Sequence, residues 1–150
     1  MAGNRITEKT MYGKCLCGEV EFEVQRESLK LYQCHCLLCR KQSGTYSNAA
    51  TIVAKEYFRF LSGQSTISSW VKDTGFRSDF CSCCGSPVPN VLRGSDYYWI
   101  PAGLLEGGGK LEVVSHLFLD SKADWDKEYP SAERHAEFPG FDEHIAKLMD

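Results

Sequence analysis

The sequence lacks the marks of several broad protein classes. No apolar run approaches the roughly 18 residues of a membrane-spanning helix, and the first eight residues lack the apolar core of a secretory signal peptide. No internal repeat or low-complexity linker divides the chain, so its 150 residues predict one domain (1–150) with a sizeable core. We therefore expect a cytoplasmic protein that makes no membrane contact.

Basic charge is also scarce. The 17 Lys and Arg residues are outnumbered by 20 Asp and Glu residues, which gives a formal net charge of −3. A general nucleic-acid surface needs an excess of positive charge to neutralise phosphates. The composition therefore predicts no nucleic-acid partner, and it leaves the oligomeric state open.

Helix signals are few, and most segments have the pattern of short strands. Residues 19–24 alternate strictly, so Val20, Phe22 and Val24 should share one face of a strand. Other segments rich in β-branched and aromatic residues predict strands at 47–53, 57–61, 66–71, 77–80, 97–100 and 113–118. Such a chain favours an all-β fold of antiparallel sheets.

Two short helical segments are predicted beside these strands. A turn should follow Cys39 and end at Gly44, which suits a helix C-cap. A C-terminal helix is predicted at residues 141–149, because Phe141, Ile145 and Leu148 recur at helical spacing.

The spacing of the cysteines is the unusual feature of this sequence. The eight cysteines fall into three clusters: Cys15 and Cys17, then Cys34, Cys36 and Cys39, then Cys81, Cys83 and Cys84. In a reducing cytosol such spacings favour metal ligands over disulfides. Thiolate sulfur is soft and selects zinc, copper(I) or iron–sulfur clusters over magnesium.

Counting ligands predicts two metal sites. A C-x-C and a C-x2-C knuckle, each followed by a glycine, combine into a closed set of four thiolates: Cys15, Cys17, Cys81 and Cys84. The middle cluster supplies three sulfurs, which leaves a fourth position for water or a substrate, as in a catalytic zinc site.

Other interpretations of the cysteines stay open at this point. The second site is purely structural if His35, another chain or Cys83 closes it. In another interpretation, the middle three cysteines are redox thiols that bind no metal. Cys83 is either a spare thiol or a replacement for Cys84, although Gly85 favours the C-x2-C pairing.

Taken together, these motifs resemble the glutathione-dependent formaldehyde-activating enzyme family, whose domain is shared with centromere protein V. The resemblance extends from about residue 13 to residue 139. It rests on four segments of the sequence: GKCLCG at 13–18, CHCLLCRKQSG at 34–44, FCSCCG at 80–85 and HLFLDSKADW at 116–125.

The resemblance implies a β-tent fold of antiparallel sheets and two zinc ions per chain. It implies a structural zinc at Cys15, Cys17, Cys81 and Cys84, and a second, more exposed zinc at Cys34, Cys36 and Cys39. The implied activity is that of a carbon–sulfur lyase, which joins glutathione and formaldehyde reversibly to form S-hydroxymethylglutathione. Family membership is a better guide to fold and metal than to substrate.

The leading hypothesis is therefore a zinc-dependent carbon–sulfur lyase acting on a thiol–aldehyde adduct, with glutathione as its small-molecule partner. Glutathione carries carboxylates, so Arg40 and Lys41 beside the open site are candidate substrate-binding residues, as is Arg77. His35 is a candidate proton shuttle, and His116 a candidate for the wall of the site. The alternative is a zinc-stabilised binding module without catalysis.

Overall fold

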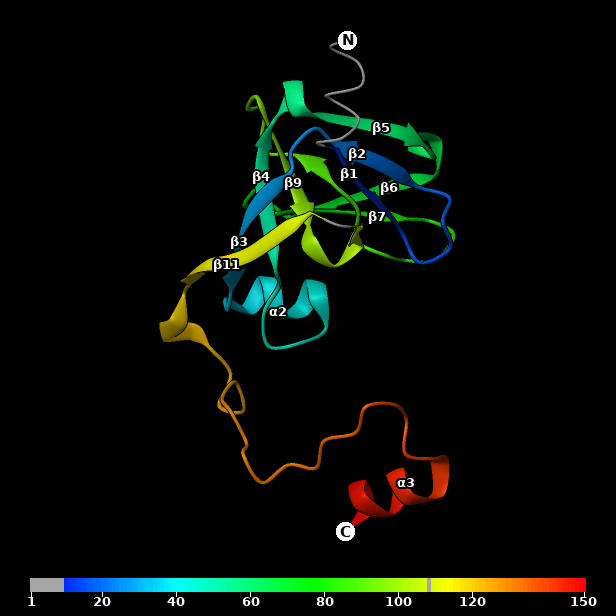
Figure 1. Ribbon diagram of the computed structural model, residues 1–150. Helices are drawn as coiled ribbons and strands as arrows, with labels where there is room; N and C mark the ends of the chain where they lie inside the picture. Colours follow the sequence, from blue (N-terminus) through cyan, green and yellow to red (C-terminus); the bar gives the residue numbers. More distant parts are fainter. Residues whose placement is uncertain (1–9, 108) are drawn as a thin grey trace.

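The computed structural model describes residues 10–107 and 109–150, and the strands in this part form three sheets (Figure 1). The sheet orders are β10-β1-β2-β5, β11-β3-β4-β9-β8 and the hairpin β6-β7. The predicted lack of a signal peptide concerns residues 1–8, which lie outside the described residues. The strand bounds are β1 Met11–Lys14, β2 Glu21–Val24, β3 Ser28–Cys34, β4 Ala50–Ala54, β5 Phe58–Ser62, β6 Ile67–Val71, β7 Arg77–Cys81, β8 Asn90–Val91, β9 Tyr97–Pro101, β10 Leu105–Glu106 and β11 Lys110–Leu117.

The prediction of a mostly β chain with antiparallel sheets is confirmed, with one correction. Strand β11 pairs with β3 in parallel, whereas the other pairings between described strands are antiparallel. A parallel partner needs a long connection, and the chain between Cys34, where β3 ends, and Lys110, where β11 begins, supplies it. Strand β3 itself was not predicted, although its Leu29 and Leu31 alternate with polar residues and are buried.

The core explains why the alternating β2 segment forms a strand here. Val20, Phe22 and Val24 are fully buried, as the alternation predicts. Phe22 packs with Met11, Leu29 and Ile100 in a cluster that joins the first two sheets. A second, smaller cluster of Cys15, Val20, Cys81 and Val88 lies where β1 and β7 end, so burial brings two distant cysteine clusters together.

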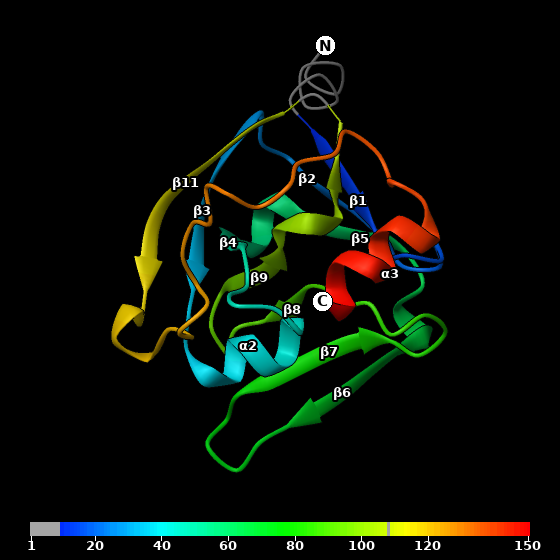
Figure 2. The same ribbon diagram turned by 90° about the horizontal axis from the view of Figure 1, so that it is seen from below.

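Both predicted helices are present. Helix α2 spans Leu37–Ser43 and ends at Gly44, whose left-handed φ of 72° suits a C-cap. Helix α3 spans Phe141–Met149 and follows a long segment that leaves the end of β11 (Figures 1 and 2). Among the described residues, no helix has both the length and the apolar character needed to cross a membrane.

Three of the short 3₁₀ helices join consecutive strands, and the fourth follows β11. Their bounds are η1 Lys55–Tyr57, η2 Gln64–Thr66, η3 Ala102–Leu104 and η4 Leu119–Ser121. The last of these turns the chain away from β11 after Phe118, which has a left-handed φ of 59°. This turn matters for the site, because beyond it Asp126 contacts His35, which lies between β3 and α2.

Candidate metal centres and adjoining cavity

The four-cysteine cluster forms where the ends of β1 and β7 meet. Cys15 and Cys17 follow β1, while Cys81 ends β7 and Cys84 follows it. The backbone N–H groups of Gly18 and Gly85 donate to the carbonyls of Cys15 and Cys81, at 3.0 Å and 2.7 Å. Both glycines have left-handed φ values, 84° and 80°. The two predicted knuckles are therefore tight turns that glycine completes.

The sulfur geometry of this cluster fits a tetrahedral zinc ion. Cys17 Sγ lies 3.7 Å from Cys15 Sγ and 3.8 Å from Cys81 Sγ. Four sulfurs at about 2.3 Å from a zinc ion in tetrahedral geometry are about 3.8 Å apart. A disulfide would bring two sulfurs to about 2.05 Å, and all eight cysteines are free thiols. The cluster can hold a metal ion, and zinc suits it.

The pKa values of these thiols also indicate that the cluster can hold a metal ion. Hydrogen bonding from the hydroxyl and backbone N–H of Ser86 lowers the pKa of Cys84 to about 5. A hydrogen bond from the backbone N–H of Glu19 acts to lower the pKa of Cys17. Desolvation of its sulfur and hydrogen bonds to the neighbouring sulfurs outweigh it and raise that pKa to about 12. Sulfurs this close cannot all ionise without a compensating cation, and a bound metal supplies that charge.

The three-cysteine cluster lies between β3 and α2. Cys34 ends β3, Cys36 is the N-cap of α2 and Cys39 is in its first turn. Their sulfurs lie within 4.8 Å of one another, and no His, Asp, Glu or fourth Cys of the described residues joins the group. The sequence interpretations in which His35 or Cys83 closes this site are therefore not supported. Three soft donors and an open fourth position suit zinc with an exchangeable ligand.

The three thiols differ in their surroundings. Burial raises the pKa values of Cys34 and Cys39. Burial acts in the same direction on Cys36, but the backbone N–H groups of Cys39 and Leu38 bond its sulfur and lower its pKa. The bond from Cys39 N to Cys36 Sγ measures 3.4 Å. Cys36 is thus the sulfur of the three that the protein itself stabilises as a thiolate.

A cavity of about 230 Å³ opens beside this cluster, lined in part by Cys34 and Cys39. Tyr32 and Trp99 form an aromatic wall, fixed by a hydrogen bond of 3.0 Å from Trp99 Nε1 to the Tyr32 hydroxyl. Asn90 also lines the cavity and is buried, and its Oδ1 has no hydrogen-bond partner among the described residues. A buried acceptor of this kind suits a ligand that brings an N–H group.

Two arginines line the same cavity, and their situations differ. Arg77 is paired with the buried Asp79, at 2.7 Å from Nε to Oδ1. Within the described part of the chain Arg93 has no carboxylate partner. Its guanidinium lies over Gly75, where an added Cβ would come within 3.2 Å of Arg93 Cζ. Arg93 therefore offers an unneutralised positive charge to an anionic ligand.

The predicted substrate-binding residues Arg40 and Lys41 lie on α2, close to the cluster in sequence. They are not among the residues that line the cavity at Cys34 and Cys39. Lys41 instead lines a neighbouring apolar groove of about 580 Å³, together with Leu37 and Trp70. Both side chains remain candidates for attracting an anion toward the site.

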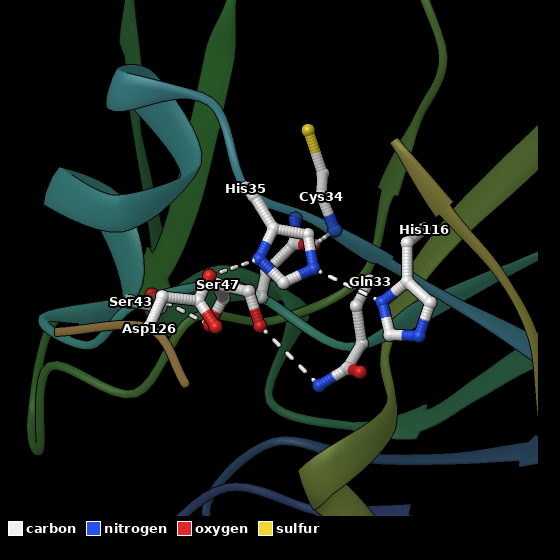
Figure 3. Close-up of polar contacts among 8 residues, drawn as sticks. Gln33, Cys34, His35, Ser43, Ser47, His116 and Asp126 are labelled. Carbon is white, nitrogen blue, oxygen red and sulfur yellow. Dashed lines mark hydrogen bonds and ion pairs between the residues drawn. The ribbon is translucent and has the colours of Figure 1, made fainter. Parts of the chain in front are cut away.

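Sequence reasoning missed the partner of His35. His35 is buried, and its Nδ1 bonds the Asp126 carboxylate while its Nε2 lies 3.0 Å from His116 Nδ1 (Figure 3). An ionised carboxylate only accepts, so His35 Nδ1 donates, and in a neutral ring Nε2 then accepts from His116. His116, which the sequence suggested for the wall of the site, is exposed. No local pattern distinguished Asp126 from the other acidic residues nearby.

The fold and the two clusters define a class of protein: a mostly β chain with one closed and one open thiolate site. The chain belongs to the glutathione-dependent formaldehyde-activating enzyme family, whose model matches residues 10–121. This membership confirms the resemblance seen in the sequence. It supports an enzyme and a role connected with glutathione and formaldehyde.

A solved structure shares the fold. The crystal structure of a Rhodobacter sphaeroides protein, a structural genomics target, is similar to this chain with a TM-score of 0.54 and 24% identity. The similarity covers 69% of this chain and 100% of that one. None of the curated proteins matches the chain significantly.

Proposed function

We propose that this protein is a zinc-dependent carbon–sulfur lyase that acts on a thiol–aldehyde adduct, with glutathione and formaldehyde as the pair that fits best. The observation that carries the proposal is the three-cysteine cluster, which is open at its fourth position and faces a cavity. In the joining direction, the thiol sulfur forms a bond to the aldehyde carbon as the C=O π bond breaks. The thiol proton ends on the new hydroxyl, and the reverse reaction breaks the C–S bond.

Each part of the site has a task in this proposal. A zinc ion at Cys34, Cys36 and Cys39 would stabilise the substrate thiol as a thiolate at neutral pH. The aromatic wall of Tyr32 and Trp99 excludes water from one side of the thiol's backbone. The four-cysteine site has no open position and serves the fold.

The cavity also suits the charged ends of a glutathione-like thiol. Arg93 and Arg77 can bond its carboxylates, since guanidinium geometry matches a carboxylate. Asn90 Oδ1 can accept from an amide or ammonium group of the same molecule. We propose that Arg40 and Lys41 act at the rim, where they draw the anion toward the cavity.

The direct test measures how fast glutathione and formaldehyde equilibrate in the presence of the zinc-loaded protein. The proposal expects acceleration in both directions, and loss of it after chelation of the second zinc. Other thiols in parallel assays define the substrate. A chain that holds two zinc ions but changes no rate, with any of several thiols, would contradict the lyase and favour the binding module.

Replacing Arg93 with alanine tests whether the substrate carboxylate binds in the cavity or at the rim of the site. We expect Arg93→Ala to raise KM for glutathione about tenfold or more with a smaller change in kcat, because the lost contact binds the part of the substrate that does not react. A thiol without carboxylates should show no such rise. Arg40→Ala is the comparison, and an equal or larger KM effect there would place the carboxylate site on α2 instead.

A further inference from the structure

Residues 123–126 dock against the loop that carries the three-cysteine site, although they follow β11 at the other end of the sequence. Ala123 is buried, at 5% exposed. The Trp125 ring stacks on Tyr46 with 5.6 Å between centroids and 12° between planes. Asp126 bonds His35, 91 positions earlier in the chain. Two contacts, from Trp125 to Tyr46 and from Asp126 to His35, thus hold this segment in place, and Ala123 is buried just before them.

Asp126 bonds His35, which lies in the sequence between the proposed ligands Cys34 and Cys36. In Figure 3 the His35 ring and the Cys34 sulfur point to opposite sides of the backbone. Successive side chains of an extended segment alternate in this way. Fixing the His35 ring therefore limits the rotation of the backbone that aims Cys34 and Cys36.

The His35 ring is held at both nitrogens and its backbone is held as well. Its Nε2 meets His116 of β11, and its backbone N–H donates to the Leu117 carbonyl at 2.9 Å. On the opposite side, the Cys34 N–H donates to Asn48 Oδ1 at 2.9 Å. The remaining ring nitrogen has Asp126 as its partner, and that carboxylate is itself 10% exposed. A buried carboxylate is stable only when it is paired.

We propose that Asp126 is a positioning residue for the three-cysteine site, acting through His35 to keep Cys34 and Cys36 aimed at a common point. Removing a group that bonds a metal ligand directly typically changes metal affinity 10–100-fold, and Asp126 bonds the residue between two ligands, so we expect the lower end of that range. The inference requires a metal at the three cysteines, as the proposed function does, but it does not require the lyase activity. The inference is therefore tested by measuring metal binding rather than activity.

The test follows zinc release from the full, zinc-loaded chain to a chromophoric chelator. Cys39→Ser, which removes a ligand of the second site, identifies which release phase belongs to that site. We expect Asp126→Ala to speed this phase about tenfold or more and to leave the four-cysteine phase unchanged. Asp124→Ala, which removes the same charge from an exposed side chain two residues away, should release both ions at the wild-type rates.

Two further measurements separate positioning from a general loss of structure. Asp126→Asn keeps an oxygen that can accept from His35 Nδ1, so it should restore most of the slow release. The absorption bands of a cobalt(II)-substituted second site should shift in Asp126→Ala and return in Asp126→Asn. Adding Asp126→Ala to His35→Ala should cause no further acceleration.

The outcomes separate the inference from the proposed function. If Asp126→Ala releases both metal ions faster, or behaves as Asp124→Ala does, the inference is wrong and the lyase proposal stands. If the wild-type chain binds no metal at the three cysteines, both are wrong. Selective acceleration with recovery in Asp126→Asn supports the inference even where no lyase activity is found.

Discussion

Replacing Cys17 with serine should lower Tm by about 10 °C or more, because the binding energy of a structural zinc is largely folding energy. Cys17 is exposed, so serine there removes little packing and the loss can be assigned to the metal site. Cys15→Ser, Cys81→Ser and Cys84→Ser should also damage folding, with an added packing loss at the buried Cys15 and Cys81.

Thermal unfolding measured alongside zinc content checks this result. Cys83→Ser is the matched control, because Cys83 is also exposed and belongs to neither group of proposed metal ligands. Removing zinc from the wild-type chain with a strong chelator should reproduce the loss of Tm. A Cys17→Ser protein with the Tm of Cys83→Ser would show that the four-cysteine site does not support the fold.

Replacing Cys36 with serine should have the opposite signature: the fold remains and the activity is lost. Zinc content should fall from two ions per chain to one, and the acceleration of the thiol–aldehyde reaction should drop about 100-fold or more, since the substrate thiol loses the centre that ionises it. The fold should survive because Cys36 is the N-cap of α2, and serine is among the preferred N-cap residues.

Comparison of the two serine variants tests the division of labour between the sites. Cys34→Ser and Cys39→Ser should resemble Cys36→Ser in metal content, with Tm closer to wild type than that of Cys17→Ser. Equal losses of Tm at the two clusters would contradict one structural and one catalytic site. Full activity in Cys36→Ser would instead remove the open cluster from the mechanism.

The candidate ligands could be predicted from sequence because the spacing within each cysteine cluster is local, whereas the meeting of Cys17 with Cys81, 64 positions later, depends on the fold. Two knuckles with glycine after each, and three cysteines within six positions, leave few ways to arrange the sulfurs. The same is true of α2, where Gly44 marks the end, and of α3, where the apolar spacing marks the helix. The tent arrangement of the sheets, in contrast, stays a prediction.

What the sequence determined by itself, then, is which residues can bind metal and where the short helices lie. Only the tertiary structure decided that Arg93 rather than Arg40 lines the cavity, and that Asp126 meets His35. The parallel pairing of β11 with β3 brings His116 and Leu117 beside Gln33 and Cys34. The physical reason is separation along the chain: spacing constrains atoms a few residues apart, whereas groups 91 positions apart meet only when burial of the core and the pairing of the sheets bring their elements together.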